Sequence, residues 1–600
     1  MSVHVEAKIL TMLEGFSELL GALRAIIPIL GRSIATGQLL RPSCELVPAS
    51  PDVHCDYDVR IPISDGTYVT ANIFRSRRAM DSGQTVPTIM SAHPYDASLL
   101  PARGRTPAGG PPQQYRLIPQ ARRPRFSELT SWEAPDPNFW TDAGYAVVNM
   151  NMPGYATSTG QPSILGENQT RAFYEAIEWV AAQPWSNGRV GLSGVSYLAI
   201  SQYYVATCKH LGGPPPALRA ISPWEGVADF YREFLNEGGI TECGFPNFWW
   251  ITEVKPAING TAADLLAHDG TLPPRLILDH PDYDDFWKAR APQLEDITLP
   301  MLVCGSFADH GLHTEGSFNA FVRAQSKQKW LYTHRDLKWD AFYSDEALAT
   351  MRSFFDCFLK KDGDQSMLER ASVRLEVRSA RELIHKVREE HEWPLARTVY
   401  RPLYLDLSQG RLSNSEQATT SHVAWNAQRG SGTALTYVFE DATEWTGHMK
   451  LRLWVEVRAL GNAVPNDMAI FAALRKLDRR GNIVPFHGAG GNKFDAICHG
   501  QIAASCRKLD PEGSTPWRPQ LLHNKKQLLE PGVAVVVEIP LPPSSTWFEA
   551  GEGVELVVAP TQIIRSPPFR KDSSRNAGIH VLHGGSEFDS HLLVPEIPQG

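Results

Sequence analysis

Strand-like and helix-like segments alternate between residues 46 and 365, and this alternation restricts the fold more than any other feature of the chain. GRVGLSG (188–194) is a short apolar run between turn residues, which is typical of a buried strand. ENQTRAFYEAIEWVAAQP (167–184), just before it, spaces its apolar residues like one face of a helix. This order predicts an α/β fold with a parallel sheet and helical crossovers.

Two changes in residue pattern divide the rest of the chain. Residues 225–298 are rich in aromatic and turn residues, which suits a cap inserted over the sheet. From about residue 370, short runs of alternating polarity are separated by Pro, Gly, Asp and Asn, as in all-β domains. We therefore predict an N-terminal helical extension (1–45), an α/β core (46–224 and 299–365), a helical cap insertion (225–298) and a C-terminal β-sandwich or jelly-roll domain (370–600).

Composition excludes several classes of function. A formal net charge of −8 argues against a nucleic-acid partner, which would require a basic surface. The 8 cysteines form no CxxC pair, so we interpret them as reduced thiols in a cytoplasmic protein. No apolar run is long enough for a transmembrane span. The amphipathic stretch ILTMLEGFSELLGALRAIIPIL (9–30) favours packing on the body of the protein or on a second subunit, which would make a homodimer.

Ser196 is the candidate nucleophile. It lies in GLSGVSYLA (191–199), between a predicted strand and a predicted helix. A sharp strand-to-helix turn exposes a serine hydroxyl, and a small residue before the serine permits that turn. The segment has one glycine of the G-x-S-x-G pattern and Leu198 at the place of the second. A structural serine in a packed corner is the alternative.

The sequence after Ser196 offers an acid and a base. CGSFADHG (304–311) places Asp309 just after a buried strand, where α/β-hydrolase folds carry the acid. KWLYTHRDLKW (329–339) places His334 after the next strand, and we predict it as the base that Asp309 orients. Alternatives nearby are Asp336 and Asp340 for the acid, and His310 and His313 for the base.

An oxyanion needs two hydrogen-bond donors. The backbone N–H of Tyr197 follows the serine and is one candidate. Tyr95, in MSAHPYDAS (90–98), could offer its hydroxyl or simply pack on its loop. We expect no metal and no cofactor, because the histidines lack ligand spacing. Aromatic residues of the cap region are the candidate substrate contacts: Trp224, Phe248, Trp249 and Trp250.

Together these segments resemble the cocaine esterase / Xaa-Pro dipeptidyl-peptidase superfamily of serine hydrolases (CocE/NonD-like). The resemblance rests on PYD (94–96), EAIEWVAAQPWSNGRVGLSGVSYLAISQ (175–202), FAD (307–309), NDMAIFAALRKLDRRGN (466–482) and DSHLLVPEIP (589–598). It implies an α/β-hydrolase core, a helical cap and a C-terminal jelly roll beside the active site. It also implies a triad of Ser196, Asp309 and a histidine, with Tyr95 and Tyr197 as the oxyanion hole.

One departure concerns the base. In the esterase branch the histidine aligns with Lys338 of this chain, and a lysine of ordinary pKa is protonated and cannot act as base. THRDLKW (333–339) resembles relatives whose loop starts with a histidine, so we retain His334. The predicted function is hydrolysis of an ester or related acyl bond of a small molecule through an acyl-enzyme. Alternatives are acyl transfer in specialised metabolism, Xaa-Pro peptidase activity and a catalytically silent binding protein.

Overall fold

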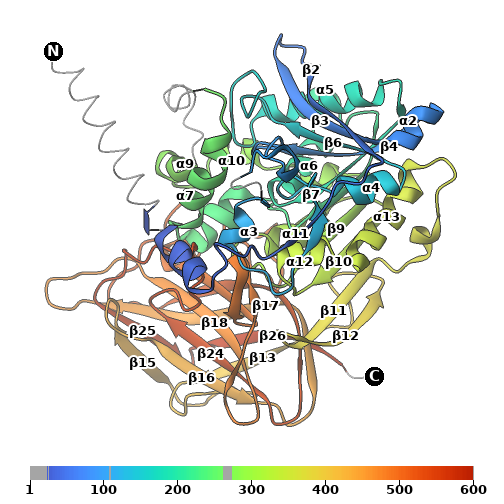
Figure 1. The fold of residues 1–600 in the computed structure, drawn as a ribbon. Helices are drawn as coiled ribbons and strands as arrows, with labels where there is room; N and C mark the ends of the chain where they lie inside the picture. Colours follow the sequence, from blue (N-terminus) through green and yellow to red (C-terminus); the bar gives the residue numbers. More distant parts are fainter. Residues whose placement is uncertain (1–22, 25, 107–109, 261–272, 599–600) are drawn as a thin grey trace, which may run out of the picture.

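A mostly parallel sheet forms the centre of the α/β region. The computed structural model describes residues 23–24, 26–106, 110–260 and 273–598. The sheet order is β2–β3–β6–β4–β7–β8–β9–β10–β11–β12 (Figure 1). Its strands are β2 (Val53–Pro62), β3 (Tyr68–Ser76), β4 (Val86–His93), β6 (Ala146–Asn151), β7 (Ser186–Val195), β8 (Leu218–Trp224), β9 (Met301–Ser306), β10 (Lys329–His334), β11 (Val373–Ala380) and β12 (Leu383–Glu390).

From β6 to β11 the pairing is parallel, as the alternation of strands and helices predicts. The connecting helices are α4 (Pro137–Asp142), α5 (Glu167–Ala181), α6 (Tyr197–Ala206), α11 (Thr314–Arg323), α12 (Lys338–Phe342) and α13 (Asp345–Leu359). Carboxyl ends of parallel strands share one edge of a sheet, so the loops after β4, β7, β8, β9 and β10 meet there.

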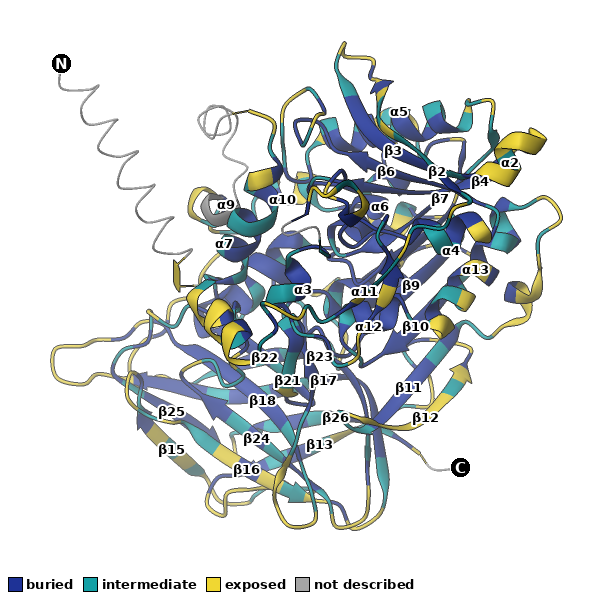
Figure 2. Ribbon diagram, in the orientation of Figure 1, coloured by how far each residue is buried: buried dark blue, intermediate teal, exposed yellow. Residues whose placement is uncertain are grey.

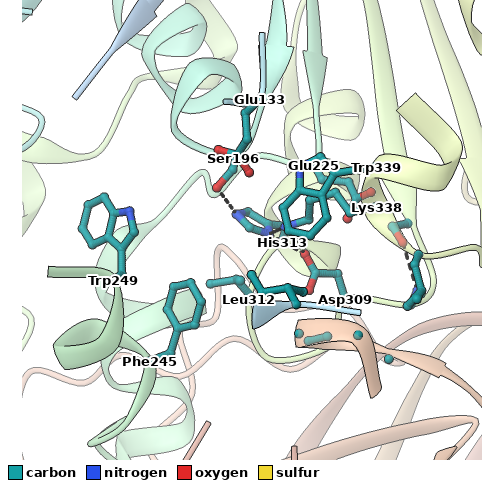
Figure 3. Close-up of a pocket in the computed structure, with 18 of the residues that line it drawn as sticks. Glu133, Ser196, Glu225, Phe245, Trp249, Asp309, Leu312, His313, Lys338 and Trp339 are labelled. Atoms are coloured by element: carbon teal, nitrogen blue, oxygen red, sulfur yellow. Dashed lines mark hydrogen bonds and ion pairs between the residues drawn. The ribbon is translucent and has the colours of Figure 1, made fainter. Parts of the chain in front are cut away.

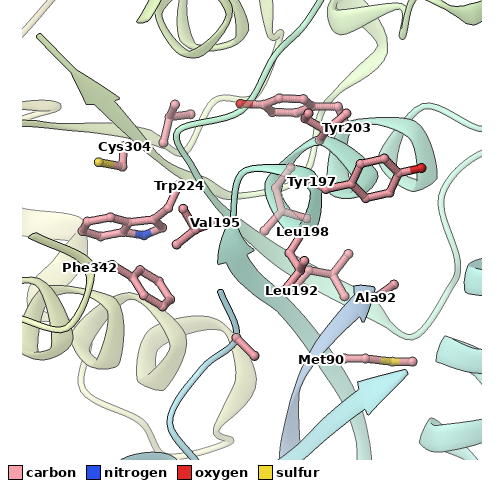
Figure 4. Close-up of a cluster of buried hydrophobic side chains, with 14 of the residues drawn as sticks. Met90, Ala92, Leu192, Val195, Tyr197, Leu198, Tyr203, Trp224, Cys304 and Phe342 are labelled. Carbon is pink, nitrogen blue, oxygen red and sulfur yellow. The ribbon is translucent and has the colours of Figure 1, made fainter. Parts of the chain in front are cut away.

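Strand β7 lies between two helix layers. Successive side chains of a strand point to opposite faces. Ser193 contacts Met351 of α13, whereas Leu192 lies beside Leu198 of α6 (Figure 4). Both faces of β7 are therefore covered, and residues 190–195 are buried (Figure 2). This rigid strand ends directly before Ser196.

Short helices form the cap between β8 and β9. They are η4 (Phe230–Leu235), α7 (Phe245–Trp249), η6 (Trp250–Val254), α9 (Pro273–Asp279) and α10 (Asp285–Arg290). Aromatic contacts hold them together: the ring centroids of Tyr231 and Trp287 are 5.3 Å apart. Residues 261–272, in the predicted cap range, lie outside the described residues.

The C-terminal region is all-β, drawn from orange to red in Figure 1. Its strands are β13 (Val399–Asp406), β14 (Arg411–Ser413), β15 (Ser421–Asn426), β16 (Thr433–Val438), β17 (Thr443–Arg458), β18 (Ala469–Leu477), β19 (Ile483–Val484), β20 (Phe486–Gly488), β21 (Asn492–Asp495), β22 (Cys498–Ala503), β23 (Val535–Phe548), β24 (Gly553–Ala559), β25 (Ile579–Gly584) and β26 (His591–Ile597). Its own apolar core includes Leu453, Leu474 and Val537. Strand β11 joins the regions, because it pairs with β10 at Leu331–Val373 and with β23 at Arg378–Thr546.

The predicted N-terminal helical extension is only partly described. Residues 1–22 and 25 lie outside the described residues, and residues 26–35 are helical. Exposed apolar side chains on this segment include Ile27 and Ile34, each 60% exposed. Among the described residues, no helix has the length and apolar character needed to cross a membrane.

Candidate active site

Ser196 lies on a strained turn between β7 and α6. Ser196 has a φ of 59° and a ψ of −117°. A positive φ is strained for any residue other than glycine, and backbone strain of this kind is concentrated at functional sites. Gly194, with φ 146°, permits the turn, because a Cβ there would lie 2.5 Å from the Cβ of Leu198. The Ser196 N–H donates to the Trp224 carbonyl at 3.0 Å. The serine is thus held at the carboxyl edge of the sheet.

His313 is the histidine beside this serine. Its Nε2 lies 3.1 Å from Ser196 Oγ, and its Nδ1 is hydrogen-bonded to Asp309 Oδ2 (Figure 3). The turn after β9 brings the acid and the base together: the Asp309 carbonyl accepts from the N–H groups of Leu312, His313 and Thr314. A serine, histidine and aspartate in this sequence of contacts have the geometry of a catalytic triad.

The structure corrects the prediction for His334. This histidine is the last residue of β10, and its Nε2 lies 3.1 Å from Oε1 of buried Glu225. Strand β10 is the third neighbour of β7, about 14 Å away at the usual strand spacing. The side chain of a residue within β10, such as His334, is too short to reach Ser196 from that strand. The local spacing that could have identified His313 is its position four residues after Asp309.

Lys338 is a buried cation in the same cluster. Its Nζ lies 2.9 Å from Asp309 Oδ2 and 2.9 Å from His313 Nδ1. Burial and the Lys338 charge lower the pKa of His313 to about 4, against the opposing effect of Asp309. Burial disfavours the Asp309 anion, but Lys338 and His313 hold its pKa well below the usual range. The imidazole is therefore neutral and the carboxylate ionised at neutral pH.

Tyr95 and Tyr197 offer the donors expected at an oxyanion hole. Trp249 Nε1 donates to Tyr95 Oη at 3.1 Å, so the hydroxyl proton of Tyr95 is free to point elsewhere. Burial raises the pKa of Tyr95 well above its usual value, which keeps that proton in place. The Tyr197 hydroxyl is bound to Gln169 Oε1 at 2.6 Å. Tyr197 is the first residue of α6, so its backbone N–H has no acceptor within the helix.

Aromatic side chains of the cap and of the β domain line the pocket around Ser196, beside Trp132 and Trp339 of the α/β core. Trp249 and Phe245 come from α7, and Phe569 comes from the β domain; the rings of Phe245 and Phe569 stack with centroids 4.9 Å apart. Gly488–Gly491, at the tip of the β20–β21 hairpin, also line the pocket.

Three of the four predicted aromatic contacts are not among the pocket-lining residues. Trp224 packs between Tyr332 and Phe342, and its Nε1 donates to Ser222. Phe248 and Trp250 are buried at 1% and 2% exposure in the cap. Neighbouring helical residues point to different sides, so the adjacent aromatics of 248–250 cannot all face one cavity.

Three glutamates also line the pocket: Glu133, Glu225 and Glu253. No sequence pattern predicts that these three residues lie together. Glu133 and Glu225 have left-handed φ values of 62° and 52°, like Ser196. Burial raises the pKa of Glu133 well above its usual value, raises that of Glu225, and raises that of Glu253 to about 8. The pocket therefore combines an apolar wall with weakly acidic carboxyl groups.

The described residues do not favour a metal at this site. Ligand atoms of Glu225, Asp309 and His313 lie within 4.8 Å of one another. However, the Lys338 ammonium already contacts both Asp309 and His313 at 2.9 Å. A second cation would be repelled from the position that Lys338 occupies.

The fold and this site define an α/β-hydrolase with a C-terminal all-β domain, an enzyme of the serine hydrolase type. The chain belongs to the CocE/NonD family of hydrolases. It is 31% identical to a CocE/NonD family hydrolase from Staphylococcus aureus, with 92% of this chain and 97% of that chain covered and a TM-score of 0.81. The predicted family and fold class are confirmed.

Other comparisons agree with this assignment. Residues 65–336 match the X-Pro dipeptidyl-peptidase (S15) family, and residues 368–593 match the X-Pro dipeptidyl-peptidase C-terminal non-catalytic domain. Cocaine esterase from Rhodococcus sp. (strain MB1 Bresler) is 26% identical over 438 residues, which is 64% of this chain and 67% of that protein. An α-amino acid ester hydrolase structure, at 15% identity and a TM-score of 0.65, shares the fold over 92% of this chain and 98% of that chain.

Proposed function

We propose that the protein hydrolyses an ester of a small-molecule acyl substrate through an acyl-enzyme on Ser196. The observation that carries this proposal is the continuous contact from Ser196 Oγ to His313 Nε2, at 3.1 Å, and from His313 Nδ1 to Asp309. A serine hydroxyl becomes a useful nucleophile only when a positioned base takes its proton. His313 is that base in our proposal, in place of His334.

In the first half of the reaction, Ser196 Oγ attacks the ester carbonyl carbon while its proton passes to His313 Nε2. The carbonyl oxygen becomes an oxyanion, which the Tyr95 hydroxyl and the Tyr197 N–H stabilise. Asp309 accepts from Nδ1–H throughout and stabilises the imidazolium. The tetrahedral intermediate then breaks its bond to the alcohol oxygen, which leaves with the proton from Nε2.

In the second half, water replaces the alcohol. His313 takes a proton from water as the oxygen attacks the acyl carbon, and the same two donors hold the second oxyanion. When the bond to Ser196 Oγ breaks, the proton returns to that oxygen. The products are a carboxylic acid and an alcohol, and the enzyme regains its initial state.

The test is active-site labelling with a fluorophosphonate together with hydrolysis of p-nitrophenyl acetate. Wild-type protein should be labelled once per chain and should release p-nitrophenol with a burst. Ser196→Ala should lose both signals, whereas Ser193→Ala, a change of a buried serine on β7 that faces α13, should keep them. Labelling that is equal in wild type and Ser196→Ala would reject the proposal.

Peptidase activity is the second candidate, and the pocket carboxyls favour it. The N-terminal ammonium of a peptide would favour the ionised forms of Glu133, Glu225 and Glu253, whose pKa values burial raises in its absence, and could then pair with them. Hydrolysis of glycyl-prolyl-p-nitroanilide would support this activity. If that substrate is inert while p-nitrophenyl acetate is cleaved, the ester reaction stands alone.

We also propose a homodimer in the cytoplasm. The exposed apolar residues Ile27, Ile34 and Leu40 of the N-terminal segment support the dimer, and the eight free cysteines support a reducing compartment. Light scattering would give twice the 66.6 kDa chain mass for a dimer. A monomer by this measurement would reject that part of the proposal.

A further inference from the structure

Three polar atoms meet behind the Ser196–His313 contact: Lys338 Nζ, Asp309 Oδ2 and His313 Nδ1. Each of these atoms is within hydrogen-bonding distance of the other two. The side chains of Lys338, Asp309 and His313 are only 12%, 5% and 3% exposed. A cation in direct contact with both the acid and the base of a triad must affect how the imidazole carries its proton.

The neutral imidazole of His313 can carry its proton on either ring nitrogen, which gives two hydrogen-bonding arrangements. In the first, Nδ1–H donates to Asp309 and Lys338 also donates to Asp309, so Nε2 presents its lone pair to Ser196. In the second, Lys338 donates to an unprotonated Nδ1, and Nε2–H points at Ser196. Only the first can accept the serine proton. It is favoured because the ionised Asp309 accepts from both neighbours at once.

Lys338 cannot replace His313 as the base. Burial disfavours its cation, but Asp309, Glu225 and Glu133 raise the pKa of Lys338 above its usual value. Glu253 of η6 and His334 of β10 also face the cluster, and His310 and Asp495 lie on the far side of Asp309. Glu133, Glu225 and Glu253 all have raised pKa values and carry less negative charge than exposed glutamates. Asp309 is therefore the principal counter-ion of Lys338.

We propose that Lys338 is a positioning residue that acts on Ser196 through His313. Its ammonium keeps Asp309 ionised as the acceptor for Nδ1–H, and it disfavours a second positive charge on the imidazole. This inference rests on the proposed function, because it assigns Lys338 a role in activating the same serine. Its consequence is that the site stays competent in mildly acidic solution, where an ordinary histidine of pKa about 6.5 would be protonated.

The test is the pH dependence of fluorophosphonate labelling in short pulses, on protein shown to be folded at each pH by tryptophan fluorescence. The wild-type rate should fall on the acid side with a midpoint near pH 4, the pKa expected for His313. Lys338→Met should raise this midpoint by about one to three pH units, because the nearby positive charge is lost. Lys338→Gln is the substitute if the Met variant does not fold.

Two controls separate positioning from packing. Lys338→Arg keeps the charge and should retain the wild-type midpoint. Lys360→Met removes a lysine that pairs with Asp356 at 2.7 Å outside the pocket lining, and it should also leave the midpoint unchanged. A wild-type midpoint in the folded Met or Gln variant, or an equal shift in the Arg variant, would overturn the inference. Loss of Ser196-dependence would instead reject the proposed function.

Discussion

His313 Nε2 lies 3.1 Å from Ser196 Oγ, although the two residues are 117 positions apart in the chain. His313→Ala should therefore lower kcat for p-nitrophenyl acetate by at least ~10³-fold, because the serine loses its base. His334→Gln should retain most of the activity, since His334 contacts Glu225 instead. Steady-state kinetics on the two folded variants make the comparison. A larger loss in His334→Gln than in His313→Ala would reverse our assignment of the base.

Tyr95→Phe should reduce kcat by about 10²–10³-fold, the usual effect of removing one oxyanion donor. The protein should remain folded, because the phenyl ring preserves the packing. Trp249→Phe is the matched control: it removes the N–H that orients the Tyr95 hydroxyl at 3.1 Å, but it leaves the hydroxyl itself. We expect it to lose less kcat than Tyr95→Phe. Full activity in Tyr95→Phe would exclude its hydroxyl from the oxyanion hole.

Gly194→Ala should destabilise the turn before Ser196. An added Cβ would lie 2.5 Å from Leu198 Cβ, and a core clash of this kind costs about 1–3 kcal/mol. Gly188→Ala is a control for backbone strain alone, since Gly188 also has positive φ, 79°, but no atom within 4 Å of the added Cβ. Denaturant unfolding should show the greater loss for Gly194→Ala. Equal losses would mean that strain, and not the clash, dominates.

Asp340→Asn should stabilise the protein at alkaline pH. Burial, followed by the charge of Asp336, raises the pKa of Asp340 to about 7. A carboxyl with a raised folded-state pKa contributes stability below its unfolded pKa of about 3.9, and this stability is lost as pH rises through 7. Asparagine keeps the acceptor oxygen for the Ala121 and Arg122 N–H groups without the charge.

Thermal unfolding across pH tests this. At pH 8 the apparent Tm of Asp340→Asn should exceed that of wild type by roughly 2–4 °C, and the difference should vanish near pH 4. Asp362→Asn changes an exposed aspartate and should show no such trend. A difference that grows toward acid pH would contradict the raised pKa.

The sequence sufficed for features that depend on local pattern. Strand–helix alternation predicted the parallel sheet, and the strand, small residue and helix around Ser196 predicted the turn. Asp309 was placed by the buried strand before it. These inferences need only nearby residues, because strand ends and turns are set locally by apolar period and by glycine.

The partners of Ser196 could not be derived in the same way. His313 lies in the turn after β9 and His334 is the last residue of β10, and only the arrangement of strands and turns in space brings His313 to Ser196. Glu133 comes from a loop and Glu253 from the cap helix η6, and no sequence pattern points either of them to the pocket. Lys338 was visible as a departure from the esterase branch, but its contacts with Asp309 and His313 depend on how the loops after β9 and β10 meet.

The β20–β21 hairpin brings Gly488–Gly491 to the wall of the pocket, and Gly491 lies so close to Pro119 that an added Cβ would be 2.5 Å from its carbonyl oxygen. This hairpin belongs to a different core from the triad. Mutations in it can therefore change which molecules fit without disturbing Ser196, Asp309 or His313. The pocket wall and the triad thus rest on separate cores, and the hairpin is the place to begin redesigning substrate preference.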